Sequence, residues 1–436
     1  MPNTYLTQTI SSSTGKIFTL SMWIKKSAND SFNQLFHLSS DSNTHKYIDV
    51  ATKSAYGLDV QLKNGSGGAF VRRRTNRLLR DFSGWFHILI RFDSTQGSAG
   101  DRLRIYINGE QETSIDADST PDVPQDYVTD LNSNGGTLQI GRNPYNGGTG
   151  FFDGIISHYY LCDGYSYAPT VFGSTDSTTG EWKINTSPSI TMGTNGFTIL
   201  KDGNTITDQS SNSNDFSLGG GTLTKTEDCP SNVFATLNPL SSNTSTTLSK
   251  GSTQVDYGAA AQSSRGTLGF SSGKFYWEIK TSAVGSGYPM VGIGDMDKIE
   301  MQVPNQQSYP GGFANSYGII GDGRVYANGS NTGNQGFTYT TNDIIGIAVD
   351  LDSGTKTIKW FKNGSQIATY NITNTATFSV IDYSNASSDQ LQYNFGNGYF
   401  GTTAVSSAGT NASGNGIFEY DVPTGYTALS TKGLNT

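Results

Sequence analysis

The chain has 436 residues, of which 15% are charged, and its formal net charge is −8 at pH 7. Domains usually hold about 100–200 residues, so this length exceeds one sandwich domain and suits two. The acidic balance disfavours a protein that binds nucleic acid through a broad basic surface. No run reaches the roughly 18 apolar residues of a membrane helix, so we expect no membrane insertion.

The composition indicates short strands joined by many turns. Gly numbers 53, Tyr 23 and Phe 22, while the small charged fraction argues against a disordered polyampholyte. Clear strands are expected at residues 18–24 and 85–92. Another at residues 103–107 leads directly into Asn108-Gly109. Asn-Gly favours a two-residue type I′ hairpin turn, because both positions of that turn need positive φ.

The second half of the chain repeats this pattern. Residues 274–279 alternate, and residues 344–350 form a mainly apolar run typical of a buried strand. Residues 357–361 alternate and lead into Asn363-Gly364, a second hairpin signal. Helical periodicity is almost absent, so the sequence predicts an all-β fold of two antiparallel β-sandwiches.

Apolar residues become sparse between residues 203 and 250, where Ser, Thr, Asn and Gly dominate. We therefore predict sandwich domains at residues 1–224 and 246–436, joined by a Ser/Thr/Asn-rich connector at residues 225–245. Pro230 and Pro239 interrupt the connector, and we expect its backbone to be extended and to run along the surface.

The sequence contains few residues suited to redox or metal chemistry. Cys162 and Cys229 lie in different segments, so we expect unpaired thiols in a protein made in a reducing host cytoplasm. The N-terminal residues have neither a basic region nor an apolar core, so no signal peptide is expected. The four histidines lack metal-ligand spacing, and no Walker loop or Gly-x-Ser-x-Gly elbow occurs. We expect no metal and no cofactor.

Calcium is the one ion for which the sequence offers a candidate site. Asp202, Asp208 and Asp215 lie in an Asn-rich loop whose oxygens could hold Ca²⁺. A solvated loop without an ion is the alternative, and the favoured one.

Five motifs in the second half resemble SPRY domains and follow one another in that family's order. They are residues 271–278 (Ser-Ser-Gly-Lys-Phe-Tyr-Trp-Glu), 291–294 (Val-Gly-Ile-Gly), 316–319 (Ser-Tyr-Gly-Ile), 343–350 with Lys362-Asn363-Gly364, and 394–396 (Asn-Phe-Gly). The resemblance implies a SPRY-type sandwich in this half.

The first half is similar to the laminin-G-like members of the concanavalin superfamily. The matching pieces are residues 18–23, 85–87, 108–109, 138–141 and 152–156. The resemblance implies a concanavalin-like jelly roll. Many relatives carry an acidic residue after the last of these strands, and some use it for calcium. Here Ser157 and His158 follow instead, which argues against a metal at that place.

The junction resembles the connector of structural proteins of marine tailed phages, which pair a laminin-G-like domain with a SPRY domain. The matching residues are 195–200, 208–211 and 232–240, together with Arg80-Asp81 and Trp85-Phe86-His87. The resemblance implies a virion protein on the tail or capsid surface that recognises a host surface glycan or a neighbouring virion protein. Self-association with a second copy is a further candidate, and nucleic acid is not an expected partner.

Three carboxylates of the second half have a spacing similar to that of a hydrolase centre. Asp295, Asp297 and Glu300 mimic the Glu-x-Asp-x-x-Glu spacing of laminarinases, whose retaining chemistry needs two carboxyls about 5–5.5 Å apart. The first Glu is missing, and the segment is expected to be a loop in the SPRY half. We therefore expect no enzyme. A glycan depolymerase and an intracellular SPRY adaptor that binds peptides are the alternatives.

Candidate binding residues are aromatic. Tryptophans 23, 85, 277 and 360 fall on expected strands and should pack in cores. Tyr145, Tyr288 and Tyr309 fall on expected loops, where they could stack on a glycan or a protein partner. An ordinary amphipathic surface tyrosine is the alternative for each.

A run of arginines is a candidate docking surface for an acidic partner. Its members are Arg72, Arg73, Arg74, Arg77 and Arg80. We expect residues 70–74 and 77–82 to be the arms of a hairpin, with Arg72 and Arg74 on one face of the first arm. The alternative is an exposed hairpin balanced by nearby carboxylates.

Overall fold

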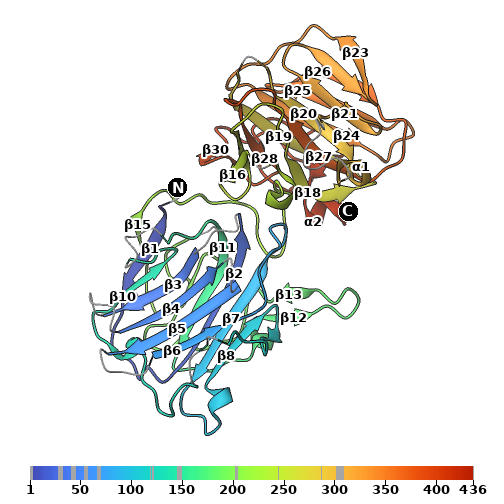
Figure 1. Ribbon diagram of the computed structural model, residues 1–436. Helices are drawn as coiled ribbons and strands as arrows, with labels where there is room; N and C mark the ends of the chain where they lie inside the picture. The colour runs from blue at the N-terminus through green and yellow to red at the C-terminus, as the bar shows by residue number, and fades with distance from the viewer. Residues whose placement is uncertain are drawn as a thin grey trace. The chain divides into compact units, whose positions relative to one another are not determined.

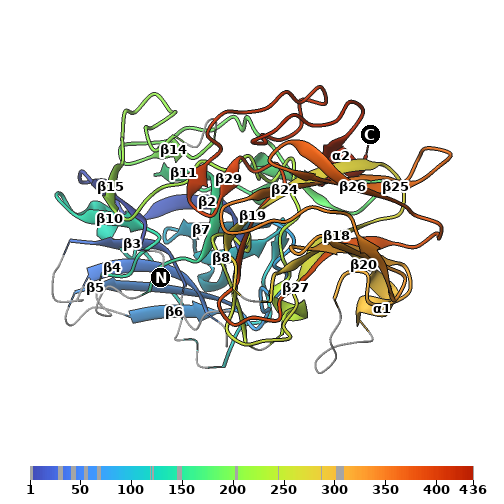
Figure 2. The same cartoon turned by 90° about the horizontal axis from the view of Figure 1, so that it is seen from above.

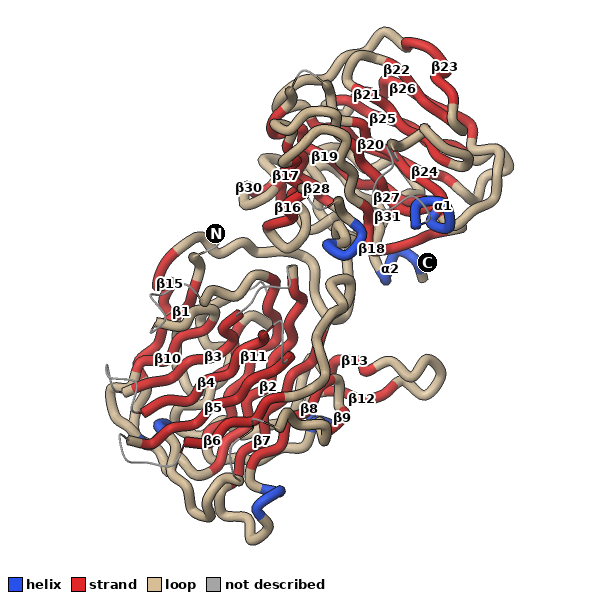
Figure 3. Tube along the Cα trace, viewed as in Figure 1, coloured by secondary structure: helices blue, strands red, loops and turns tan. Residues whose placement is uncertain are grey.

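The computed structural model describes residues 3–435 except 28–32, 41–45, 54–56, 66–69, 118, 120–121, 145–149, 202–204, 244, 286 and 301–308. Its elements are mainly short strands joined by turns, with a few single-turn helices (Figure 3). The chain divides into two compact units, Met1–Lys225 and Thr226–Thr436. Both are built from sheets that are almost wholly antiparallel, which confirms the predicted all-β fold.

The first unit contains two large sheets (Figure 1). In spatial order, the seven-stranded sheet comprises β15 (Ser217–Gly220), β1 (Tyr5–Thr9), β10 (Thr137–Ile140), β3 (Asn33–Ser39), β4 (Lys46–Lys53), β5 (Gly57–Asn64) and β6 (Phe70–Arg74). The six-stranded sheet comprises β14 (Phe197–Ile199), β11 (Gly154–Asp163), β2 (Ile17–Lys26), β7 (Phe86–Asp93), β8 (Leu103–Ile107) and β9 (Glu110–Gln111). Alternate residues of both sheets, such as Leu20, Leu38 and Val60, are fully buried in one core.

A third layer covers the outer face of the six-stranded sheet. It contains η3 (Pro169–Val171) and a hairpin of β12 (Gly173–Thr175) and β13 (Trp182–Ile184). Beneath it, Tyr160 and Cys162 of β11 form a small apolar cluster with Phe172. Burial raises the pKa of the Cys162 thiol to about 12, so this thiol stays protonated and unreactive at neutral pH.

The second unit also contains two large sheets. The eight-stranded sheet comprises β16 (Thr246–Ser249), β17 (Gln254–Tyr257), β28 (Gln390–Asn394), β19 (Lys274–Ala283), β24 (Ile344–Asp350), β25 (Thr357–Lys362) and β26 (Ser365–Asn371), with β31 (Thr427–Ala428) paired to β19. The six-stranded sheet comprises β18 (Arg265–Phe270), β27 (Phe378–Tyr383), β20 (Met290–Asp295), β21 (Ser316–Ile320), β22 (Arg324–Ala327) and β23 (Ser330–Asn334). Figure 2 shows β25 and β26 in one layer and β20 and β27 in the other.

Short elements complete the description. They are η1 (Ala99–Asp101), η2 (Asp130–Asn132), η4 (Pro239–Ser241), β29 (Tyr399–Phe400), β30 (Thr403–Ala404), α1 (Met296–Glu300) and α2 (Thr431–Leu434). Within the residues that the structure covers, no helix is long and apolar enough to cross a membrane.

The predicted hairpin turns and core tryptophans are confirmed. Asn108 and Asn363 have φ of 50° and 48°, and the glycine after each also has positive φ, as a type I′ turn requires. Trp277 and Trp360 face the same residue, Ile347, across β19, β24 and β25. All three side chains are fully buried in the core of the second unit.

The expected surface course of the connector is wrong for its central residues. Phe234, Ala235 and Leu237 are buried in the core of the second unit. Phe234 forms a bridge with Ser430, and Leu237 forms one with Gly266. The segment is therefore part of the second unit, because its few apolar side chains are buried in the hydrophobic core of that unit.

Candidate functional site

Two of the predicted binding tyrosines lie together on the outer face of the six-stranded sheet of the second unit. Tyr288 and Tyr309 pack against a cluster that also includes Tyr326 and Tyr383. The ring centroid of Tyr309 lies 5.7 Å from that of Tyr326 and 5.8 Å from that of Tyr383. We call these four residues the tyrosine surface. Tyr145, the third predicted tyrosine, lies outside the described residues.

Glycines of the underlying strands hold Tyr288 and Tyr309 in place. A Cβ added to Gly318 would lie 2.6 Å from the Cβ of Pro310, so Pro310 can pack there only because residue 318 has no side chain. This contact fixes the segment that begins with Tyr309. Tyr288 has a φ of 51°, and a Cβ on Gly321 would lie 2.7 Å from its ring. The tyrosine surface is therefore preorganised by tight backbone packing.

A charged pair lies beside the tyrosine surface. The Arg324 guanidinium donates to Asp322, with Nε 2.8 Å from Oδ2, and to the Tyr326 hydroxyl at 2.8 Å. These hydrogen bonds hold the pKa of Asp322 below its usual value. Arg324 also lies 5.6 Å from the centroid of the Tyr326 ring. Aromatic rings with hydroxyl tips beside an arginine are typical of protein-binding surfaces.

Each main member of the arginine run pairs with a carboxylate of its own unit. Arg72 and Arg74 contact the buried Asp59, at 2.5 and 3.4 Å, which confirms that they share a face of β6. In addition, Arg73 pairs with Asp122, and Arg77 pairs with Glu110 and Glu112. These ion pairs favour the alternative in which nearby carboxylates balance the arginines, and not a docking surface with excess positive charge.

The predicted second arm of the arginine hairpin is wrong. β6 pairs with β5, and Thr75 bridges to Ile115. Residues 77–82 form no strand, and Arg80 is exposed. The residue after β6 therefore pairs with Ile115, which is distant in sequence, and no local hairpin forms there.

The carboxylates that resemble a hydrolase triplet do not share a strand face. Asp295 is the last residue of β20, while Asp297 and Glu300 belong to the short helix α1, so the expected loop is also wrong. Asp295 accepts a hydrogen bond from the Asn315 side chain at 2.7 Å. The one-face arrangement that the laminarinase chemistry uses is therefore not present in this segment.

Asp208, one of the aspartates considered for calcium, already accepts donors from its own loop. Its carboxylate accepts hydrogen bonds from the backbone of Thr198, Ser210 and Asn214 at 2.9 Å and from the Ser210 hydroxyl at 2.8 Å. Asp202 lies outside the described residues. In the part of the chain that is described, no three His, Cys, Asp or Glu side chains are grouped to hold a metal.

His87 and Glu278 are two fully buried titratable groups on the central strands. Burial lowers the pKa of His87 to about 3. Burial raises the pKa of Glu278 to about 7, although four donors contact its carboxylate. Neither side chain is accessible, since both are 0% exposed. They therefore act in stability and not in binding, as expected for His87 from its place in an apolar strand.

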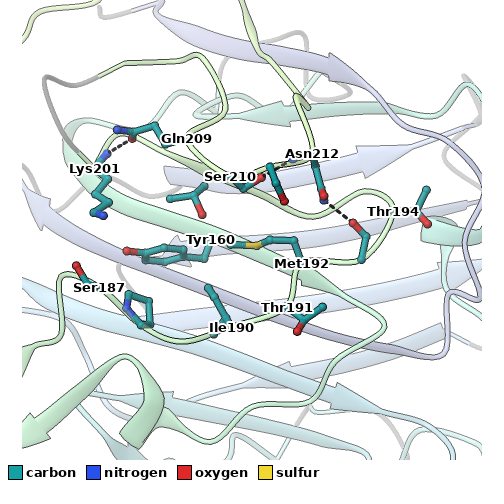
Figure 4. Close-up of a pocket in the computed structure, with 14 residues that line it drawn as sticks. Tyr160, Ser187, Ile190, Thr191, Met192, Thr194, Lys201, Gln209, Ser210 and Asn212 are labelled. Atoms are coloured by element: carbon teal, nitrogen blue, oxygen red, sulfur yellow. Dashed lines mark hydrogen bonds between the residues drawn. The ribbon is translucent and has the colours of Figure 1, made fainter.

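A hollow of about 750 Å³ opens on the first unit, where sequence reasoning had placed no site. Its floor includes Tyr160 of β11 and Thr198 of β14, which face each other across the two strands. Figure 4 shows residues 187–191 and 209–212 on opposite sides of the Tyr160 and Met192 side chains. Loop segments about 20 residues apart form its walls, so no local motif could have revealed it.

Both units match known families. Residues 3–171 match the concanavalin A-like lectin/glucanases superfamily, and residues 274–398 match the SPRY domain. No curated protein matches the chain.

Similar solved structures include the TRIM65 PSpry domain, with 17% identity over 37% of this chain and 88% of that chain, at a TM-score of 0.30. The SPRY domain of human HERC1 has 17% identity over 36% and 96%, at a TM-score of 0.30. A heptameric SAP-like pentraxin from Limulus polyphemus has 16% identity over 44% and 89%, at 0.29. The family matches, and not these distant structural likenesses, identify the units: the chain carries a concanavalin-like domain followed by a SPRY domain.

Proposed function

We propose that the protein is a non-enzymatic binding component of a tailed-phage particle, on the surface of the tail or capsid. Its SPRY domain docks on a neighbouring virion protein, and its concanavalin-like domain recognises a host surface glycan. The observation that carries the docking role is the tyrosine surface, where three half-buried rings from separate segments pack with the buried Tyr383, and Arg324 contacts one of them, Tyr326. Tyrosine and arginine are enriched where proteins bind each other tightly.

The virion context rests on the resemblance of the connector and of the domain order to phage structural proteins. The present domains agree with that order. A binding role also suits both families, because a rigid sandwich presents loops and outer sheet faces to partners.

The proposal assigns no catalysis to either domain. The hollow of the first domain is lined by fourteen residues, none of them Asp or Glu. Glycoside hydrolysis usually needs a pair of carboxyl groups flanking the bond. The depolymerase alternative therefore has no support at this hollow or at α1.

The docking role predicts that Tyr309→Ala and Tyr326→Ala will each lower incorporation of the chain into particles at least about tenfold, since aromatic residues at such centres often contribute 2 kcal/mol or more. Incorporation can be measured by quantitative mass spectrometry of purified particles from a complemented phage.

Tyr370→Ala is the matched control, because Tyr370 is also half-buried but lies on β26 of the other sheet. Thermal unfolding must show that each variant still folds. Normal incorporation of the two tyrosine-surface variants, or absence of the parent chain from particles, would contradict the proposal.

A further inference from the structure

We infer that the hollow on the concanavalin-like domain is an oligosaccharide site. This inference rests on the glycan part of the proposed function and gives it a location. Tyr160 alone among the lining residues lies within residues 3–171, the part that matches the concanavalin family. The site is therefore built mainly by residues 187–212, which follow the part of the chain that matches the concanavalin family.

The lining offers hydroxyl and amide groups on an apolar base. The polar side chains are Ser187, Thr191, Thr194, Thr198, Lys201, Gln209, Ser210, Ser211 and Asn212. Hydroxyl and amide groups both donate and accept hydrogen bonds, as sugar hydroxyls do. Ile190 and Met192, which are half-buried, supply apolar surface for the C–H faces of sugar rings, whereas Tyr160 is buried. About 750 Å³ lies within the range of about 300–1,000 Å³ typical of ligand sites.

Hydrogen bonds fix one wall of the hollow before any ligand arrives. The Asn212 side chain donates to the carbonyl oxygens of Gly193 and Gly196, at 2.5 and 2.9 Å. The Asn214 side chain donates to those of Thr194 and Gly196, at 2.9 and 2.8 Å. These bonds join the loop of residues 209–214 to residues 193–196, and Asn212 and Thr194 lie at the same end of the hollow in Figure 4. A preformed site avoids part of the entropy cost of ordering on binding.

The groups that would meet a sugar are open to solvent. Ser187, Thr191, Thr194 and Ser211 are exposed, so a ligand hydroxyl can replace the water that solvates them. A protein partner would find a poor match, because the centres of protein interfaces are enriched in aromatic and apolar groups. That description fits the tyrosine surface of the SPRY domain and not this polar hollow.

Charge restricts the class of glycan. Lys201 is the one charged residue among the lining residues, and it lies at the same end of the hollow as Gln209 (Figure 4). A glycan with amino groups would meet this positive charge, whereas a neutral or acidic glycan would not be repelled. The site therefore suits neutral hexose chains or chains with uronate or sulfate groups.

The test is binding of the full-length chain to an array of neutral, uronate-containing and sulfated oligosaccharides. Ser211→Trp and Thr191→Trp place large side chains on opposite walls (Figure 4), and each should weaken the strongest binding at least about tenfold. Ser98→Trp is the matched control, because Ser98 is also exposed but lies at the start of η1. It should bind as the parent does.

Two results would overturn the inference: no binding of the parent to any glycan of the array, or unchanged binding by both wall variants. The experiment separates this inference from the docking proposal, because Tyr326→Ala should keep glycan binding and Ser211→Trp should keep incorporation into particles. Bound glycans should also release no reducing ends during incubation. Such release would contradict the non-enzymatic role even if the site is correct.

Discussion

Lowering the pH from 7 to 4.5 should destabilise the concanavalin-like domain by about 2.5 kcal/mol through His87 alone. The imidazole stacks between Trp23 and Trp182, at centroid distances of 5.0 and 5.9 Å. Trp182 Nε1 donates to Nδ1 at 3.1 Å, so the neutral ring carries its proton on Nε2, 2.9 Å from Ser21 Oγ. A proton on Nδ1 would face the Trp182 N–H and would lie in a fully buried place.

The direction of this pH effect follows from the lowered pKa of His87. Burial lowers the folded pKa of His87 from 6.5 to about 3. The unfolded chain takes up the proton as the pH falls below about 6.5, while the folded chain stays neutral. This stability is fully present above pH 6.5 and is lost as the pH falls toward 3.

Urea unfolding followed by tryptophan fluorescence can measure the effect at pH 7, 6, 5 and 4.5. His87→Gln removes the titrating group and keeps a donor for Ser21, so the variant should lose less stability over this range than the parent. Subtracting the variant's curve of stability against pH from that of the parent removes the contribution of all other titrating groups. Parallel curves for parent and variant would show that His87 does not titrate in this way.

Raising the pH from 4.5 to 8 should destabilise the SPRY domain by about 3 kcal/mol through Glu278. The carboxylate accepts hydrogen bonds from the backbone of Glu419 and Tyr420 at 2.8 Å. It also accepts from the Tyr276 hydroxyl at 3.1 Å and from Asn394 at 3.3 Å. It thereby ties the segment that contains Glu419 and Tyr420 to β19 and β28.

For Glu278 the folded pKa is raised, from 4.5 to about 7. The unfolded chain loses its proton near pH 4.5, while the folded chain keeps it until about pH 7. The stability is therefore fully present below pH 4.5 and is lost as the pH rises through 7. Its direction is opposite to that of His87, so these two groups should contribute to the stability of their domains with opposite pH dependence.

Glu278→Gln should abolish this slope and lower the stability of the domain by about 1–3 kcal/mol, because the amide NH₂ must face one of the two backbone donors. Glu227→Gln serves as the control, since Glu227 is an exposed glutamate of the same unit. Differential scanning calorimetry between pH 4.5 and 8 resolves the transition. An unchanged slope in Glu278→Gln would rule out this assignment.

The features that sequence predicted best depend on local chemistry. The Asn-Gly turns were predictable because only a few residues tolerate positive φ at both positions. Trp277 and Trp360 were predictable as core residues because they lie on alternating strands. The SPRY motifs were recognisable for the same reason, since each occupies a single strand or hairpin.

The features that sequence missed depend on contacts between distant segments. Phe234 and Leu237 stand in a polar stretch, so nothing local indicated that a core would take them up. The hollow combines loop segments with side chains of β11 and β14, and polar loop residues carry no periodic signal. Tyr288 and Tyr309 could be placed on loops, but only the folded sheet brings them beside Tyr326.

A cryo-EM map of the assembled particle tests the central claim most directly, because it would locate each domain and its neighbours. We expect the SPRY domain to contact another virion protein through Tyr309 and Tyr326, and the hollow beside Tyr160 to remain open to solvent. A particle without this chain would contradict the account. A SPRY domain docked through another face, with the tyrosine surface in solvent, would contradict it equally.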